Sequence, residues 1–130
     1  MKPRLLADEN TSHRMVSACL QIETNFPIIH ISEWREGACL SLKDPALLMT
    51  LREAGMVLVS FDRTSLAMHA GDLTREGLGH AGVILFRRSV PTVAYGKQSR
   101  LLVEFWHNAA NWDWADRVGY LPISKAQAER

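Results

Sequence analysis

The segment Met56-Val57-Leu58-Val59-Ser60-Phe61-Asp62 is the strongest indication of the fold class of this chain. It is apolar nearly throughout until it ends at an aspartate, and it follows Gly55, a residue suited to ending a helix. A continuously apolar strand is typical of a parallel sheet that helices cover on both faces. We therefore predict a buried strand over residues 56–61 in an α/β protein.

On either side of this strand, short apolar segments alternate with segments of helical periodicity. The other predicted strands cover residues 4–7, 28–31 and 83–86. The predicted helices are one capped by Asn10 or Thr11, one over 44–54, a short one within 62–70 and one from about 97 to 109. Strands that alternate with helices form right-handed βαβ units, so we expect a three-layer α/β/α domain with a mostly parallel sheet of about four strands.

We place this domain at residues 1–110 and treat residues 111–130 as a C-terminal tail. The tail contains Trp112, Trp114 and Tyr120. Aromatic residues are enriched in the cores of protein interfaces, so the tail is a candidate contact for a partner or for a homodimer. The alternative is that these aromatic side chains pack back onto the domain's own core.

The charge of the chain is nearly balanced. It has 130 residues with 15 Lys and Arg against 14 Asp and Glu, a formal net charge of +1. This balance excludes a strongly basic, histone-like nucleic-acid binder but allows a local basic rim around an acidic site. The composition also excludes a disordered chain, a collagen and a coiled coil.

The sequence predicts a cytoplasmic protein that does not enter a membrane. No apolar run approaches the roughly 18 residues that cross a bilayer, and the acids Asp8 and Glu9 argue against a signal peptide. Cys19 and Cys39 lack CxxC spacing, so we expect two reduced thiols. The five histidines are scattered without the spacing of zinc ligands.

Three aspartates are expected at one edge of the sheet. Asp8 ends the first predicted strand, Asp62 ends the third, and Asp44 opens the helix that follows the second. In open α/β sheets the functional crevice lies beyond the carboxyl ends of the strands, where the strand order reverses. Carboxylates so close together repel one another, and a divalent cation such as Mg²⁺ removes that repulsion. We therefore expect metal-assisted hydrolysis of a phosphodiester at this edge.

Each aspartate also has a purely structural interpretation. Asp44 before Pro45 is most simply the cap of a helix, and Asp62 is placed to cap the next helix. Asp8 belongs to a polar turn between a strand and a helix. What favours a site is that all three fall at the same edge.

Four segments together resemble a known family. Leu5-Leu6-Ala7-Asp8-Glu9-Asn10, Asp44-Pro45-Ala46-Leu47-Leu48, Val57–Arg63 and Gly82–Arg87 occur in the order and spacing of the PIN-like nucleases, a group long listed as a domain of unknown function and related to VapC-type toxins. The resemblance extends from Arg4 to about Trp106.

This resemblance implies a PIN-like fold, Mg²⁺ or Mn²⁺ as cofactor, and ribonuclease activity. It also implies the role of toxin in a toxin–antitoxin pair, with an antitoxin protein as partner. Asp8, Asp44 and Asp62 match the catalytic, metal-binding acids of the family. Ser60 matches a small hydroxyl residue, and Glu9 and Asn10 match a supporting polar pair.

The chain departs from the family pattern at two places. Thr64 stands where the family often has a further acid, with Leu66 at the aromatic position that follows. Thr11 and Ser12 replace the usual apolar residue and proline after Asn10.

Basic residues near the predicted site are candidates for binding RNA phosphates, since phosphate contacts dominate affinity for nucleic acids. Their alternative is an ordinary solvated surface. The candidates are His13, Lys43, Arg63 and Arg87, with Arg88 beside the last.

Two other functions stay open. The first is a catalytically inert PIN-like module that binds a protein partner, which the residue at Thr64 favours slightly. The second is a phospho-receiver domain with Asp62 as the acceptor. A receiver needs a hydroxyl residue at the end of the fourth strand and a lysine at the end of the fifth, whereas the fourth predicted strand ends in Phe86-Arg87-Arg88.

Overall fold

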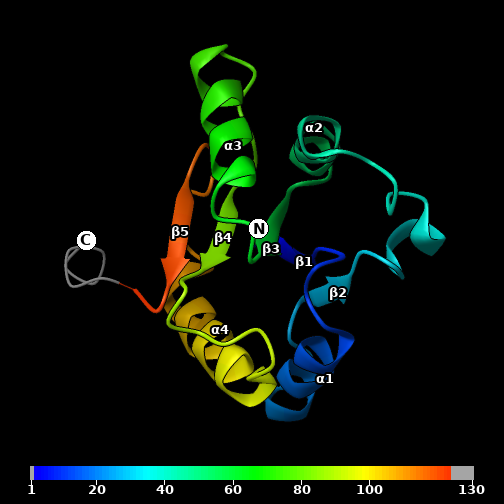
Figure 1. The fold of residues 1–130 in the computed structure, drawn as a ribbon, viewed down its shortest axis with the longest axis vertical. Helices are drawn as coiled ribbons and strands as arrows, with labels where there is room; N and C mark the ends of the chain where they lie inside the picture. Colours follow the sequence, from blue (N-terminus) through cyan, green and yellow to red (C-terminus); the bar gives the residue numbers. More distant parts are fainter. Residues whose placement is uncertain (1, 124–130) are drawn as a thin grey trace.

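Five parallel strands form the centre of the molecule in a computed structural model that describes residues 2–123 (Figure 1). The sheet has the order β2-β1-β3-β4-β5. Its strands and the helices between them are β1 (Arg4–Ala7), α1 (His13–Ile22), β2 (Ile28–His30), the 3₁₀ turn η1 (Trp34–Gly37), α2 (Asp44–Ala54), β3 (Met56–Ser60), α3 (Ser65–Arg75), β4 (Val83–Phe86), α4 (Tyr95–Ala109) and β5 (Val118–Leu121).

Strand β3 lies at the middle of the sheet, as its apolar sequence predicts. All five of its residues are buried, and it pairs with β1 on one side and β4 on the other. Leu58 is in register with Leu6 of β1 and with Val83 of β4. The chain winds from β1 to β2 on one side and then to β3 on the other, so the strand order reverses between β1 and β3.

Helices cover both faces of the sheet, which confirms the predicted three-layer α/β/α architecture. Figure 1 shows α2 and α3 over one face and α1 and α4 over the other. Successive strand residues point to opposite faces: Leu5 and Ala7 pack with α1 and α4, while Leu6 packs with α2 and α3. Both faces of the sheet are thus buried, so a ligand can reach the sheet only at its edges and at the loops that connect its strands.

The predicted count of about four strands is too low by one. Val118–Leu121 forms β5, which pairs in parallel with β4 along its whole length. Trp114 is only 4% exposed and packs in the core beside Trp106. Residues 111–123 therefore complete the domain instead of forming a tail beyond residue 110. The rest of the predicted tail, residues 124–130, lies outside the described residues.

Two predicted helix boundaries are wrong. Helix α1 is capped by Ser12, whose hydroxyl accepts a hydrogen bond from the Arg14 N–H, and not by Asn10 or Thr11. Helix α3 begins at Ser65 and continues to Arg75, so Gly71 lies inside it. By contrast α2 covers the predicted residues 44–54 and ends at Gly55 with φ of 69°.

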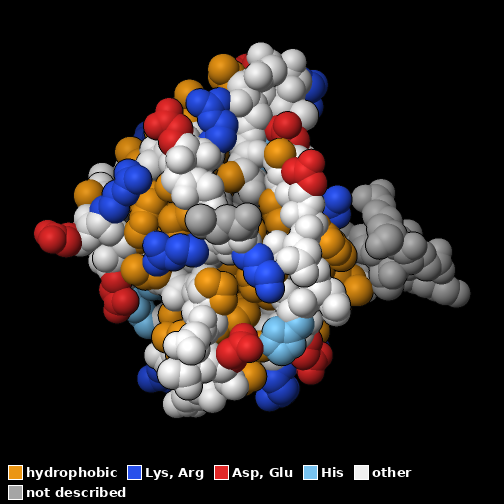
Figure 2. All heavy atoms as spheres, turned by 180° about the vertical axis from the view of Figure 1, so that it is seen from behind, with side chains coloured by type: hydrophobic (Ala, Val, Ile, Leu, Met, Phe, Trp, Pro, Cys, Tyr) orange, Lys and Arg blue, Asp and Glu red, His pale blue; other side chains and the backbone are white. Residues whose placement is uncertain are grey.

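The surface matches the balanced composition. Figure 2 shows one face of the molecule, on which basic, acidic and hydrophobic side chains are interspersed. Within residues 2–123 no helix is long and apolar enough to cross a membrane. Both cysteines are buried free thiols, and burial raises the pKa of Cys19 to about 12.

Candidate functional site

The carboxyl ends of β1 and β3 meet where the strand order reverses. The Asp8 N–H donates to the Val59 carbonyl at 3.1 Å, so the first residue after β1 is tied to the end of β3. Asp62 follows β3 by two residues, and its N–H donates to the Ser60 hydroxyl at 3.0 Å. This edge is where ligands bind in open α/β sheets.

The three predicted acids line one small cavity at this edge. Asp8, Asp44 and Asp62 share it with Glu9 and Asn10, and its volume is about 40 Å³. Apolar side chains form the remaining wall: Ile31, Leu40, Leu42, Leu47, Leu58 and Leu66. The structure therefore brings together acids that are far apart in the sequence, as the sheet topology predicts.

Asp8 is the most deeply placed of these carboxylates. It is 8% exposed, and one of its oxygens accepts hydrogen bonds from the Thr11 hydroxyl at 2.7 Å and the Asn10 N–H at 3.1 Å. Burial raises the pKa of Asp8 above its ordinary value, and the negative charge of Asp44 adds to this, while hydrogen bonds from Ser60, Thr11 and Asn10 oppose it. The charged form of Asp8 is therefore incompletely stabilised by the protein alone.

Asp62 has a different environment. The Ser65 hydroxyl donates to one carboxylate oxygen, and the N–H groups of Thr64 and Ser65 donate to the other at 3.3 and 3.1 Å. Burial raises its pKa, but these hydrogen bonds, with one from the Leu66 backbone, outweigh burial and lower the pKa of Asp62 overall. Thr64, and not Asp62 as predicted, occupies the cap position of α3. Asp62 lies two residues before it and accepts from the N–H groups at the start of the helix, which holds its charge beside the cavity.

Asp44 does not cap α2. Lys43 occupies the cap position, and Asp44 is the first residue of the helix, where a negative charge interacts favourably with the helix dipole. Asp44 still lines the cavity and raises the pKa of Asp8 through its charge. Its carboxylate is thus available to the cavity, while that of Asp62 is engaged by α3.

Ser60 and Thr11 support the site from beneath. Ser60 is fully buried, accepts from the Asp62 N–H and hydrogen-bonds to Asp8, so it joins two of the acids. The Thr11 hydroxyl contacts both the Asp8 carboxylate and, at 3.3 Å, the Val59 carbonyl. Thr11 departs from the residue that the PIN-like resemblance implies at this position. Its position three residues after Asp8 is the only signal of this contact in the sequence.

The acids of this cavity meet some of the requirements of a binding site for a hard divalent cation. Of residues 2–123, no three His, Cys, Asp or Glu side chains are grouped closely enough to hold a metal ion among them. Mg²⁺, however, often takes only one or two carboxylates and keeps several waters. Asp8 and Asp44 repel each other across the cavity, and 40 Å³ has room for about one ion or water-sized group and little more. These two acids fit a water-rich Mg²⁺ or Mn²⁺ site, with Asp62 as a third charge nearby.

The predicted RNA-binding residues separate into two pairs. His13 and Lys43 line hollows that adjoin the acidic cavity. The Arg63 guanidinium donates to the Phe86 carbonyl at 2.9 Å, and the Arg87 guanidinium donates to the Pro122 carbonyl at 2.7 Å and lies over the Tyr120 ring. Neither arginine lines the cavity or its neighbouring hollows.

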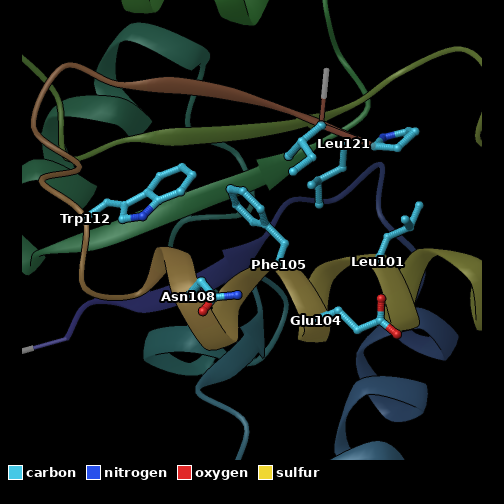
Figure 3. Close-up of a pocket in the computed structure, with 8 residues that line it drawn as sticks. Leu101, Glu104, Phe105, Asn108, Trp112 and Leu121 are labelled. Carbon is cyan, nitrogen blue, oxygen red and sulfur yellow. The ribbon is translucent and has the colours of Figure 1, made fainter. Parts of the chain in front are cut away.

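A separate apolar hollow lies far from the acids in the sequence. It has a volume of about 340 Å³ between α4 and the end of β5. Figure 3 shows Phe105 between Trp112 and Leu121 on its wall, with Glu104 at the rim. It contains no residue of the predicted site.

Comparison with known proteins adds no relative. No family model matches the chain, and no curated protein or solved structure matches it.

Proposed function

We propose that the chain is a metal-dependent endoribonuclease of the PIN-like class that acts as the toxin of a toxin–antitoxin pair. The observation that carries the nuclease proposal is that Asp8, Asp44 and Asp62, from three separate segments, line one small cavity at the switch point of the sheet. The toxin role rests on the family resemblance alone.

In this proposal Asp8 and Asp44 hold Mg²⁺ or Mn²⁺ together with water. The bound cation would supply an activated water and would stabilise the charge that grows on the phosphate oxygens. Asp8 is fixed for this task by Thr11, Asn10 and Ser60. Asp62, ionised through its hydrogen bonds with α3, adds negative charge that favours the cation.

Glu9 lies at the opening of the site. It is exposed, and it lines the acidic cavity and both adjoining hollows. Its carboxylate is free to hydrogen-bond to a water that solvates the cation, and Asn10 beside it can donate to a phosphate oxygen. These supporting roles belong to the same proposal.

The receiver alternative meets specific obstacles. The strand order 2-1-3-4-5 is also that of flavodoxin-like folds, and receiver domains share it. The residues that a receiver needs are absent from the described strand ends, because β4 ends at Phe86 and β5 at Leu121. In addition, both oxygens of Asp62 already accept hydrogen bonds from α3, which leaves a poor phosphate acceptor.

The test compares single variants of the acids in an RNA cleavage assay with Mg²⁺. Asp8→Asn and Asp44→Asn should each reduce cleavage by about 100-fold or more, since each removes one anionic ligand of the cation. Glu53→Gln on α2 is the matched control, because Glu53 is exposed and lines neither the cavity nor its adjoining hollows. Circular dichroism establishes that each variant is folded.

Expression in a bacterial host tests the toxin role separately. The wild type should arrest growth and Asp8→Asn should not. Cleavage that Asp8→Asn and Asp44→Asn leave undiminished would refute the nuclease. A folded wild type that neither cleaves RNA nor binds Mn²⁺ would favour the inert binding module instead.

A further inference from the structure

His30, the last residue of β2, is a buried polar residue to which the proposed function gives no role. It is 4% exposed, and it is in register with Ala7, the residue before Asp8. Its ring lies against the turn that leads from β1 to α1, and Figure 1 shows β1 and β2 side by side at this place. A buried polar ring needs hydrogen-bond partners, and the identity of those partners indicates what the ring does.

The partners of the His30 ring determine which of its nitrogens carries the proton. Nε2 lies 2.7 Å from the Thr11 carbonyl oxygen, which can only accept a hydrogen bond, so Nε2 is the donor. Nδ1 lies 3.1 Å from the Ser32 backbone nitrogen, whose N–H can only donate, so Nδ1 is the acceptor. His30 is therefore a neutral imidazole whose single proton is directed at Thr11.

A second histidine holds the ring in this orientation. His13, the first residue of α1, stacks on His30 with ring centroids 3.8 Å apart and an angle of 23° between the rings. The Ser32 hydroxyl lies 2.9 Å from Nδ1 of His30 and 3.2 Å from Nε2 of His13. These contacts restrict rotation of the His30 ring, so its Nε2 proton stays directed at Thr11.

Thr11 receives this hydrogen bond and makes two others to Asp8. The Thr11 N–H donates to the Asp8 carbonyl at 3.0 Å, and the Thr11 hydroxyl donates to the Asp8 carboxylate at 2.7 Å. Thr11 is only 2% exposed, so bulk water cannot replace the His30 donor at its carbonyl. A buried carbonyl without a donor is unfavourable, and loss of the His30 bond therefore favours movement of the whole turn, including the hydroxyl that orients Asp8.

We propose that His30 is a positioning residue of the acidic site, which holds Thr11 through Nε2 and thereby fixes the carboxylate of Asp8. The inference rests on the proposed function, in which Asp8 is a ligand of the cation. His30 is not among the residues that line the acidic cavity, so it acts through Thr11 and does not touch the cation. Loss of the hydrogen-bond partners that orient a metal ligand typically lowers the metal affinity by roughly 10- to 100-fold.

Two substitutions of His30 separate the bond to Thr11 from the remaining contacts of the ring. In His30→Asn the short amide takes the place of Nδ1, where it can accept from Ser32 but cannot reach Thr11. In His30→Gln the longer amide extends to the position of Nε2 and can donate to Thr11. In calorimetric titrations with Mn²⁺, His30→Asn should bind about tenfold more weakly than the wild type, and His30→Gln should remain within about threefold of it.

Thr11→Val tests the second half of the connection. It removes the hydroxyl that donates to Asp8, so it should also weaken Mn²⁺ binding by about tenfold. Thr11→Val combined with His30→Asn should bind little more weakly than either variant alone, because both act through the same contact. His80→Asn is the matched control, since His80 is another buried histidine but precedes β4 at the other edge of the sheet, and it should bind Mn²⁺ like the wild type.

Amide hydrogen exchange of the metal-free protein, followed by NMR, tests the hold on the turn without the cation. In His30→Asn the exchange of the Thr11 N–H should be accelerated by about tenfold or more relative to the amides of β3, and His30→Gln should show no such acceleration. A residue that contributes only to overall stability would accelerate the exchange of the β3 amides to the same extent.

The nitrogen-15 shifts of the wild-type histidines need no variant, and they should show the proton of His30 on Nε2. A proton on Nδ1 would overturn the proposal, as would Mn²⁺ binding by His30→Asn that equals the wild type or binding by His30→Gln that is as weak as that of His30→Asn. A folded wild type that does not bind Mn²⁺ would overturn the proposed nuclease instead. In that case faster exchange at Thr11 in His30→Asn would still support the hold of His30 on the turn, and unchanged exchange would overturn it.

Discussion

Asp8 is placed where its negative charge is poorly solvated. It is buried at the end of β1 and lies close enough to Asp44 for that charge to raise its pKa. Functional groups in active sites often lower the stability of the empty protein, because they are placed to bind a ligand. The same property gives a test that needs no substrate.

Asp8→Asn should stabilise the protein. An amide keeps an oxygen to accept from Thr11 and Asn10 but carries no charge, so the free energy of unfolding at pH 7 should rise by about 1 kcal/mol. Urea unfolding of wild type and variant measures the difference. A loss of stability on this substitution would show that the hydrogen bonds to the charged carboxylate outweigh its burial.

A second prediction concerns the pH dependence of stability and depends on His80. This residue precedes β4, whereas Asp8 and Asp62 follow β1 and β3, so it lies at the other edge of the parallel sheet. It is buried, its Nδ1 accepts from the Gly82 N–H at 3.0 Å, and its Nε2 has no hydrogen-bond partner among the described residues. Burial lowers the pKa of His80, although the charge of Asp116 opposes this. Protonation is therefore easier in the unfolded chain than in the folded one.

It follows that the stability of the wild type should fall as the pH drops below about 6.5, the ordinary pKa of histidine. His80→Asn keeps an acceptor for Gly82 and cannot take up a proton. Between pH 7 and pH 5 its melting temperature should fall by a few degrees less than that of the wild type. Parallel curves for the two proteins would mean that His80 does not contribute to the pH dependence.

At the scale of elements, the connection between β4 and β5 explains why the C-terminal residues belong to the domain. Gly82 precedes β4 with φ of 115°, and a methyl group added there would lie 2.9 Å from both the ring and the carbonyl of Trp114. Trp114 in turn donates from its indole to the Ala109 carbonyl at 2.6 Å. The residues after α4 are thus packed tightly against the start of β4.

Gly82→Ala should destabilise the protein by about 3 kcal/mol, since the side chain meets both a steric clash and an unfavourable backbone angle. Gly77→Ala is the comparison. Gly77 has φ of 77° but open space around it, so this substitution should cost only about 1 kcal/mol. Thermal unfolding distinguishes the two. Equal losses would mean that the backbone angle alone, and not the contact with Trp114, determines the cost.

The elements that sequence analysis predicted are those with strong local signals. Strand β3 has an unbroken apolar sequence, and α2 has Pro45 at its start and Gly55 at its end. Strand β5 was missed because Val118–Leu121 is interrupted by Gly119 and lacks the unbroken apolar run of the equally short β4. Its pairing with β4 depends on contacts with Trp114 and α4, which the local sequence does not reveal.

For the candidate site, the sequence predicted where the acids lie but not which groups bind them. The end of a strand follows from its apolar run, and parallel topology then brings Asp8 and Asp62 to one edge. The partners of each acid were not predictable. The hydrogen bond from Ser65 to Asp62 depends on where α3 begins, and the position of Asp44 inside α2, after the cap residue Lys43, depends on where α2 begins. A sequence gives the start of a helix only to within a residue or two.

In the molecule as a whole, two hydrophobic cores lie on opposite faces of the sheet. Trp114 completes the core on the α1 and α4 side, at the opposite end of the chain from Asp8. Trp114→Ala should cost about 3–5 kcal/mol, a large part of the stability of a domain of this size, whereas Trp114→Phe should cost less. Calorimetric unfolding would measure both. A small loss with alanine would contradict the inclusion of residues 111–123 in the folded domain.

In the proposed function, carboxylates from separate segments share one cation at the carboxyl edge of the sheet. Titration of Mn²⁺ into the protein, followed calorimetrically, tests it most directly. We expect one binding event in the wild type that is lost or greatly weakened in both Asp8→Asn and Asp44→Asn and is kept in Glu53→Gln. Absence of binding in the folded wild type, or binding that both aspartate variants retain at full strength, would contradict it.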